Sequence, residues 1–359
     1  MERFGIVGLP NAGKSALFNA LTGGDATVAA HPFSTTETNV GVAKVADVRL
    51  ARLAVMSQSR KVVPATAEFV DIAGLQKGSS SGEGLGNRFL HGIREVDAVL
   101  FVLRAFEDPN VVGGNDPLDD LATLELELVL ADAASAEGQI ERRRKAARSD
   151  KSQQPAVDAL EAAYAHLQQA TPLYRAGLGV EQLALLQPFF FLTAKRVMAV
   201  VNLGEDQLAD AEAIVAPVAA ELAGAGGEVL GVCVQLEAEA AALDDAERAE
   251  LLEGLGLGEG ALPRVARAAY HLLGLRTFFT TGDKESRAWT FRAGAKAPEC
   301  AGVIHSDLQR GFIRAEVIHW DELLDIGSWS KAKAEGRLRV EGKEYEVLDG
   351  DVLEIRFNV

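Results

Sequence analysis

The chain has 359 residues, of which 48% are hydrophobic, and its formal net charge is −16 at pH 7. This length and composition are typical of a globular protein with two or three domains. Because an acidic average surface repels phosphate, the composition argues against blanket binding to nucleic acid or to an anionic membrane. A polyanionic partner would therefore need a local basic patch.

The cysteine and histidine content predicts no metal cluster. The two cysteines, Cys233 and Cys300, are far apart and form no C-x-x-C pair, and none of the six histidines lies in a metal-spaced group. The first residues lead directly into a predicted strand without a signal peptide, and no apolar run reaches membrane-spanning length. We therefore expect a cytoplasmic protein without a membrane partner.

Short apolar runs alternate with helical patterns through the first part of the chain, which predicts a parallel sheet wrapped by helices. The predicted strands are 4–7, 67–71, 98–103, 196–201 and 228–234.

The first predicted strand is followed by Gly8-Leu9-Pro10-Asn11-Ala12-Gly13-Lys14-Ser15 and then by a predicted helix from about Ala16. Strand, glycine-rich loop and helix in this order predict a phosphate-binding P-loop. Backbone N–H groups of the loop and of the helix N-terminus would face the phosphates. We assign the nucleotide to Asn11, Ala12, Gly13, Lys14, Ser15 and Ala16, with Lys14 as the catalytic cation for the β- and γ-phosphates.

A second motif, Asp71-Ile72-Ala73-Gly74, follows the second predicted strand. Asp71 would hold Mg²⁺ through a water, Ser15 would ligate it directly, and the Gly74 N–H would bond the γ-phosphate. Between the two motifs, Thr35 is the candidate for the second hydroxyl on Mg²⁺ and for the γ-phosphate sensor. Alone Asp-x-x-Gly is a weak signal, but together with the P-loop it predicts a nucleotide hydrolase.

Residues 118–193 read as helix, with apolar residues at three- and four-residue steps that predict an antiparallel hairpin. The stripe of the first arm is Leu121, Leu124, Leu128, Ala131, Ser135 and Gly138, and that of the second is Val157, Leu160, Tyr164 and Leu167. The predicted tip, Glu141 to Lys151, concentrates six cations. Two interpretations stay open for it, a solvated face and a patch that binds a polyanion such as RNA.

Base recognition is expected from the loops after the later strands. A guanine reader would be Asn-Lys-x-Asp, but this chain has Asn202-Leu203-Gly204-Glu205. Adenine presents a lone pair where guanine presents N–H donors, so a carboxylate there gains nothing from adenine. The residues that would recognise guanine are therefore absent from this motif, and we expect the protein to prefer ATP to GTP. The last base-contacting loop would include Cys233 and Val234.

After Gly274 the sequence turns to short β-like runs, at 288–291, 312–318 and 352–357, which predict a separate small α+β domain. We therefore divide the chain into a nucleotide-binding domain at 1–117 and 197–275, an inserted helical domain at 118–196 and a C-terminal domain at 276–359.

The P-loop motif, the run from Asp71 to Leu75 with the glycine-rich stretch to Gly86, and the tail from Asp349 to Val359 together resemble the YchF family of Obg-related ATPases. The resemblance covers essentially the whole chain. It implies an α/β fold: a GTPase-like P-loop NTPase domain with a mostly parallel sheet, an inserted α-helical hairpin and a C-terminal ubiquitin-like β-grasp (TGS) domain. It also implies a preference for ATP, association with ribosomes, and Leu203 covering the purine.

Two departures bear on catalysis. Many GTPases place a water-orienting Gln where this chain has Leu75, and many members of the family resembled carry a His, proposed for catalysis, where alignment puts Phe101. An apolar ring can neither orient water nor move a proton. Beside a slow ATP-hydrolysing switch, two hypotheses therefore stay open: a nucleotide-dependent binding module with negligible turnover, and a translational GTPase, which Leu203 and Glu205 disfavour.

Asn11 lies where a subset of related GTPases without that Gln uses an Asn to help coordinate K⁺ beside the phosphates. Such a cation would stabilise charge developing between the β- and γ-phosphates. The other interpretation is that Asn11 only bonds its own loop, as Asn often does in turns.

Overall fold

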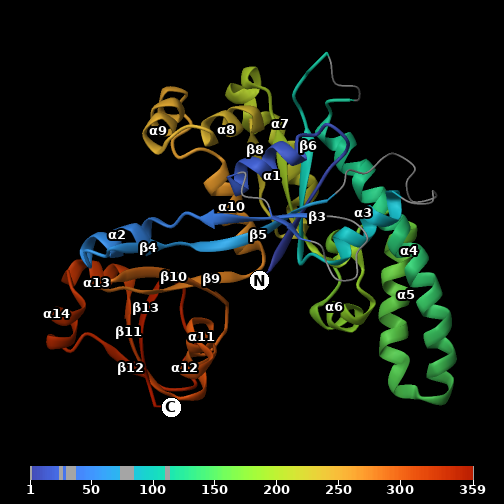
Figure 1. Ribbon diagram of the computed structural model, residues 1–359. Coiled ribbons are helices and arrows are strands. Elements are labelled where there is room, and N and C mark those ends of the chain that lie inside the picture. The colour runs from blue at the N-terminus through green and yellow to red at the C-terminus, as the bar shows by residue number, and fades with distance from the viewer. Residues whose placement is uncertain (1, 24–26, 30–37, 73–84, 110–113, 359) are drawn as a thin grey trace. The chain divides into compact units, whose positions relative to one another are not determined.

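The computed structural model describes residues 2–23, 27–29, 38–72, 85–109 and 114–358. By its internal contacts the chain forms two compact units (Figure 1). The first unit combines residues 1–43 and 68–272, and the second combines 44–67 and 273–359. The unit that contains the predicted 276–359 domain thus also includes an excursion from the N-terminal part. The helical insertion groups with the first unit, and the predicted division into three domains stays a prediction.

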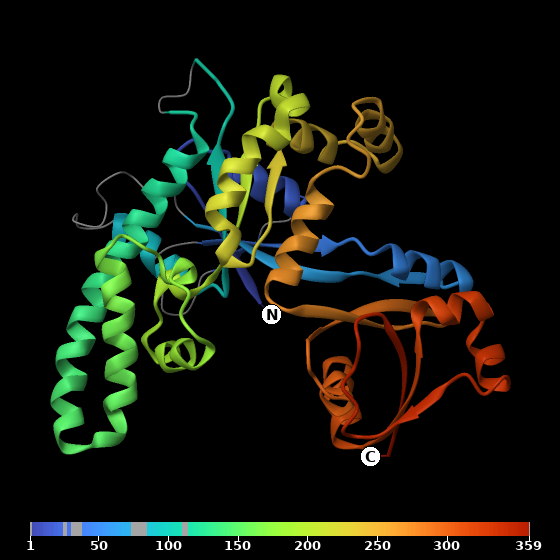
Figure 2. The same ribbon diagram turned by 180° about the vertical axis from the view of Figure 1, so that it is seen from behind.

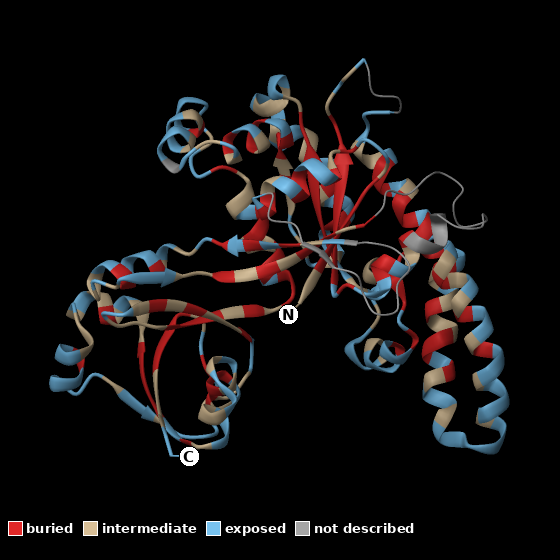
Figure 3. Cartoon of the chain, in the orientation of Figure 1, coloured by how far each residue is buried: buried red, intermediate tan, exposed pale blue. Residues whose placement is uncertain are grey.

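The first unit is built on a seven-stranded sheet in the order β2-β3-β5-β1-β6-β7-β8. Its strands β5, β1, β6, β7 and β8 are mutually parallel, and β2 runs antiparallel to β3. Every residue of β6 is buried, as expected for a central strand covered on both faces (Figure 3). The bounds are β1 Arg3–Val7, β2 Thr27–Ala29, β3 Thr38–Val45, β5 Ala65–Asp71, β6 Ala98–Arg104, β7 Arg196–Asn202 and β8 Val229–Val232.

Helices cover this sheet on both sides. Alternate residues of the strands, such as Val7, Phe101 and Val201, share one hydrophobic core with α3, α4 and α7. Helix α1 packs against β1, α8 and α10, and α10 packs against β7. The bounds are α1 Lys14–Thr22, α3 Leu85–Arg94, α7 Ala211–Leu222, α8 Val234–Ala241, α9 Asp245–Gly254 and α10 Leu262–Leu272, with 3-10 turns η6 Glu205–Asp210 and η7 Ala223–Ala225.

The predicted antiparallel hairpin is confirmed as α4 (Pro117–Ser149) and α5 (Gln154–Gln168), which lie side by side in both views (Figures 1 and 2). Pro117 is the first residue of α4, and the side chain of Asp116 caps it by accepting from the Leu118 N–H at 2.9 Å. The connection between the helices is the short turn η2 (Lys151–Gln153).

The predicted stripe on α4 is only half right. Leu121, Leu124 and Leu128 are buried, but in the core of the sheet. The hairpin core instead takes Val129, Ala136 and Ile140, and Gly138 is exposed. Helix α4 therefore contributes to two cores. Its first part packs mainly against the sheet, and its later part packs against α5. On α5, Val157, Leu160 and Leu167 are buried as predicted.

The return from the hairpin is made of short helical turns: η3 Leu173–Arg175, α6 Val180–Leu186, η4 Gln187–Phe189 and η5 Leu192–Ala194. Asp132 of α4 holds this segment. Its buried carboxylate accepts from the Leu192 N–H at 2.9 Å and from the Thr193 N–H and hydroxyl, both at 2.7 Å.

The second unit has a six-stranded sheet in the order β12-β11-β13-β9-β10-β4. The predicted runs at 288–291, 312–318 and 352–357 fall in three of these strands. Strand β4 was not predicted from the sequence, and it comes from the N-terminal excursion and pairs in parallel with β10. The bounds are β4 Lys61–Val63, β9 Leu275–Thr280, β10 Glu285–Arg292, β11 Phe312–His319, β12 Arg339–Glu341 and β13 Asp351–Phe357, with helices α2 Val48–Met56, α11 Ala297–Ile304, α12 Ser306–Arg310, α13 Trp320–Ile326 and α14 Trp329–Ala334.

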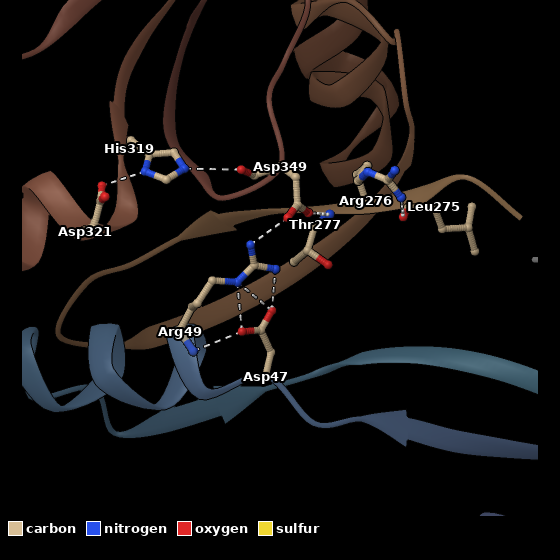
Figure 4. A network of polar contacts seen from close by, with 8 residues as sticks. All are labelled: Asp47, Arg49, Leu275, Arg276, Thr277, His319, Asp321 and Asp349. Atoms are coloured by element: carbon tan, nitrogen blue, oxygen red, sulfur yellow. Dashed lines mark hydrogen bonds and ion pairs between the residues drawn. The ribbon is translucent and has the colours of Figure 1, made fainter. Parts of the chain in front are cut away.

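A polar network ties the excursion to the rest of this unit (Figure 4). The Arg49 guanidinium of α2 lies between two carboxylates, donating to Asp47 at 2.8 Å and to Asp349 at 2.7 Å. Asp349 also accepts from the Thr277 N–H at 2.8 Å. Burial acts to lower the pKa of Arg49, but its two carboxylate partners outweigh burial and raise it overall.

Within the described residues, no helix is both long and apolar enough to cross a membrane.

Candidate nucleotide-binding site

The P-loop begins where β1 ends and leads into α1. Gly13 precedes the helix with φ of 98°, and an added Cβ would collide with the Asn202 amide, so only glycine fits there. No side chain caps the start of α1. Its first N–H groups are therefore available to a phosphate, and the helix dipole favours an anion at this end.

Asn11 adopts the left-handed conformation with φ of 63°, which Asn tolerates better than most residues. This conformation agrees with a turn role for Asn11, and a role in holding K⁺ stays a prediction.

Lys14 is a buried cation at the centre of this loop. Its side chain is 8% exposed, and Nζ donates to the Leu9 carbonyl at 2.8 Å. Burial lowers the pKa of the Lys14 ammonium, and the negative charges of Asp71 and Asp120 oppose that shift without cancelling it. A buried ammonium bonded to a neutral carbonyl gains from an anionic partner. The arrangement thus favours phosphate next to Lys14.

The two motifs predicted separately come together at Ser15 and Asp71. Strand β5 pairs with β1 so that Asp71 lies opposite Ile6, and the Ser15 hydroxyl donates to Asp71 Oδ2 at 2.8 Å. A hydroxyl and a carboxylate are ligand types that Mg²⁺ prefers, and the carboxylate can hold the ion through a water. These residues therefore fit the predicted Mg²⁺ site. The other two predicted groups, Thr35 and Gly74, lie outside the described residues.

Asn202 joins the P-loop to the loop that follows β8. Its buried amide donates from Nδ2 to the Ala12 carbonyl at 3.0 Å, and Oδ1 accepts from the Val234 N–H at 3.2 Å. Sequence reasoning placed Asn202 at the base, and the structure adds that it fastens two loops of the site to each other.

The other candidates for base recognition lie in the loop after β7, called the base loop below, and in the loop after β8, and they differ in exposure. Glu205 is exposed at the start of η6, whereas Leu203 is 2% exposed and belongs to the core beneath the sheet edge. Cys233 and Val234 are buried at the start of α8, and burial raises the pKa of the Cys233 thiol. A role for Leu203 in covering the purine stays a prediction, since in this structure its side chain lies close to Gly231 of β8.

Phe101 is fully buried in β6. Its ring belongs to the core shared with α3, α4 and α7. The ring is a packing residue here, and an apolar ring can neither orient water nor move a proton.

Two residues near the site were not predicted. Asp120, in the first turn of α4, accepts from the Arg104 N–H at 3.0 Å at the end of β6, and its charge reaches Lys14. Gln207 bridges the base loop by accepting from the Gly204 N–H at 2.8 Å and donating to the Ala105 carbonyl at 3.0 Å. The acidic first turn of α4 is the one sequence signal that could have indicated Asp120. No local sequence pattern indicates the role of Gln207.

A parallel sheet, a phosphate loop with a buried lysine, and a hydroxyl paired with a carboxylate from the next strand define a P-loop nucleotide-binding protein. Residues 3–146 match the family described as "50S ribosome-binding GTPase", and residues 275–358 match YchF-GTPase_C, described as a protein of unknown function.

The chain is 46% identical to "Ribosome-binding ATPase YchF" of Bacillus subtilis and 45% identical to the protein of the same name in Escherichia coli O157:H7, each over 99% of both chains. It also resembles the solved structure of the Schizosaccharomyces pombe YchF GTPase, with a TM-score of 0.86 and 31% identity, over 99% of this chain and 97% of that one. The chain belongs to the YchF family. The predicted family and its GTPase-like fold class are thereby confirmed.

Proposed function

We propose that this chain is an ATP-hydrolysing switch protein that associates with ribosomes. The observation that carries the proposal is the 2.8 Å contact of Ser15 with Asp71 beside the buried Lys14. The relatives named above are described as ribosome-binding ATPases, which supports both the reaction and the partner. A cytoplasmic location goes with such a partner.

The residues would act mainly by holding phosphates. Lys14 Nζ would exchange the Leu9 carbonyl for phosphate oxygens, and the N–H groups at the start of α1 would bind the same oxygens. Ser15 and Asp71 would hold Mg²⁺, which when bound neutralises charge on the β- and γ-phosphates. Catalysis of this kind depends on position and electrostatics, so a low intrinsic rate is expected without an orienting Gln or His.

The preference for ATP rests on the base loop. Leu203 and Glu205 stand where a guanine reader needs Lys and Asp, and Asn202 is occupied in joining two loops. A translational GTPase is correspondingly disfavoured. Calorimetry with both nucleotides tests this point, because a lost buried hydrogen bond should weaken GTP relative to ATP by at least about 1 to 3 kcal/mol. GTP binding as tightly as ATP would refute it.

For the ribosome, the hairpin tip offers a local basic surface on a chain whose net charge is −16. Part of the tip makes contacts within the helical region, since Arg143 stacks on Phe189 of η4 and Arg144 pairs with Glu161 of α5. Within the tip, the exposed cations that form no ion pair with a described residue are Arg142, Lys145, Arg148 and Lys151. These four would meet RNA phosphates.

A binding module with negligible turnover is the second candidate, and the buried Phe101 favours it. Hydrolysis of labelled ATP under single-turnover conditions, with protein in excess, separates the two. Conversion that Lys14→Ala abolishes supports the ATPase. Binding of ATP without conversion, even with ribosomes present, would establish the binding module instead.

A further inference from the structure

A cavity lined by cationic side chains lies in the first unit, away from the P-loop. Its volume is about 500 Å³, and it is lined by the amino end of β7, the loop before β8 and one side of α10. The P-loop follows the carboxyl end of β1, which is parallel to these strands through β6. The cavity therefore lies at the opposite edge of the sheet from the P-loop.

Three arginines line the cavity: Arg196, Arg264 and Arg267. Arg267 is neutralised, because it forms an ion pair with Glu259. Within the described part of the chain, the Arg196 guanidinium donates only to the uncharged Leu272 carbonyl. Arg264 forms no ion pair there, although its charge acts on Glu259. The three guanidinium groups outnumber the carboxylates of Glu228 and Glu259, so a net positive charge lies at this cavity in a chain whose net charge is −16.

The loop that lines one side of the cavity lies close to the backbone of β7. A Cβ at Gly227 would collide with the Val197 carbonyl, so glycine is required for this loop to lie against β7. Gly226 beside it has φ of 76°. Backbone without side chains leaves room for a ligand, and the adjacent Glu228 brings one carboxylate to the same cavity.

We propose that this cavity binds a small phosphorylated molecule, with its phosphate on Arg196 and Arg264 and its hydroxyl or amino groups on Glu228. Guanidinium groups match phosphate geometry, and the volume falls in the range of small-molecule sites. A small ligand is favoured over RNA because its uncharged hydroxyl end can face the Glu228 carboxylate, whereas a continuous phosphate backbone would place negative charge beside it.

The experiment is calorimetric titration of the full chain with ribose 5-phosphate, after saturation with ADP and Mg²⁺ to block the P-loop. We expect saturable binding that Arg264→Ala and Arg196→Ala each weaken roughly ten-fold or more. The matched control is Arg3→Ala, since Arg3 lies at the amino end of β1 but already pairs with Glu68. That variant should bind as the wild type does, and melting temperatures verify that each variant is folded.

Two further arms test the chemistry. Inorganic phosphate should bind more weakly than ribose 5-phosphate, and Glu228→Gln should weaken only the sugar phosphate. Absence of binding in the wild type, or equal affinities in the wild type and both cavity variants, would overturn the proposal. So would a short oligoribonucleotide that binds through Arg264 while ribose 5-phosphate does not. ATP hydrolysis is not measured, so failure here leaves the proposed function standing.

Discussion

The Asn202 amide gives the sharpest test of how the nucleotide site is held together. Asn202→Ala removes two hydrogen bonds, to the Ala12 carbonyl and from the Val234 N–H, and both partner residues are about 1% exposed. Each lost bond costs about 1 kcal/mol, and more where its partner is left without water. We therefore expect about 2 to 4 kcal/mol less stability towards unfolding. ATP affinity should fall at least ten-fold, equivalent to about 1.4 kcal/mol, because two loops must be ordered on binding.

The matched control is Gln207→Ala, which also removes two hydrogen bonds from the base loop but none from the P-loop. It should lower stability by about 1 to 2 kcal/mol and leave ATP affinity within about two-fold. Asn202→Asp keeps the acceptor for the Val234 N–H, but it replaces the donor to Ala12 with a negatively charged oxygen that repels that carbonyl, so it should also weaken ATP binding. Denaturant unfolding and calorimetry measure both quantities. If Asn202→Ala is destabilised but binds ATP normally, the reasoning is wrong.

Three other predictions concern separate parts of the molecule. Arg49→Ala should lower stability at pH 7 by about 2 kcal/mol, a value reduced because Asp349 is partly exposed. Burial raises the pKa of Asp349, but Arg49 and the Thr277 N–H outweigh it and lower it overall. The carboxylate's contribution is thus present above its unfolded pKa of about 3.9 and lost as pH falls through the lower folded value. The Arg49→Ala deficit should therefore shrink in denaturation experiments below about pH 4, and a constant deficit would contradict this. For the K⁺ hypothesis, ATP hydrolysis should be faster in KCl than in NaCl at equal ionic strength, and Asn11→Ala should abolish the difference; equal rates would refute the site. Reversing the charge of Arg142, Lys145 and Arg148 should weaken ribosome co-sedimentation and its salt dependence without changing ATP binding, and unchanged association would leave the tip as a solvated face.

The parts of the site that could be predicted from sequence are those whose signal is local. A strand, a glycine-rich loop and a helix N-terminus follow one another within a short stretch, so this stretch by itself was enough to assign Lys14 and Ser15. Asp71 could be added because parallel strands end at one edge of a sheet. The contact of Ser15 with Asp71 agrees with this reasoning.

What could not be predicted depends on distant partners. The apolar spacing of α4 indicates a helix, but it does not show that Leu128 faces the sheet while Val129 faces α5. The motif at Asn202 predicts a base-side residue, but its bond to the Ala12 carbonyl joins positions far apart in sequence. Strand β4 has three residues, too few for a period-2 pattern, and its partner β10 comes from the C-terminal part of the chain.

The excursion at 44–67 changes how the C-terminal region has to be understood. Its helix α2 buries Leu50 and Leu53, and its strand β4 pairs with β10 inside the second unit. A chain truncated after residue 272 would lose β10 and the Asp349 partner of Arg49 while keeping both buried leucines. The second unit therefore cannot be separated from the rest of the chain by a cut at residue 272, because residues 44–67 also belong to it. Strand β3 begins shortly after Thr35 and leads directly to Asp47 and α2. If Thr35 senses the γ-phosphate, the polypeptide itself provides a short covalent route from that residue into the second unit.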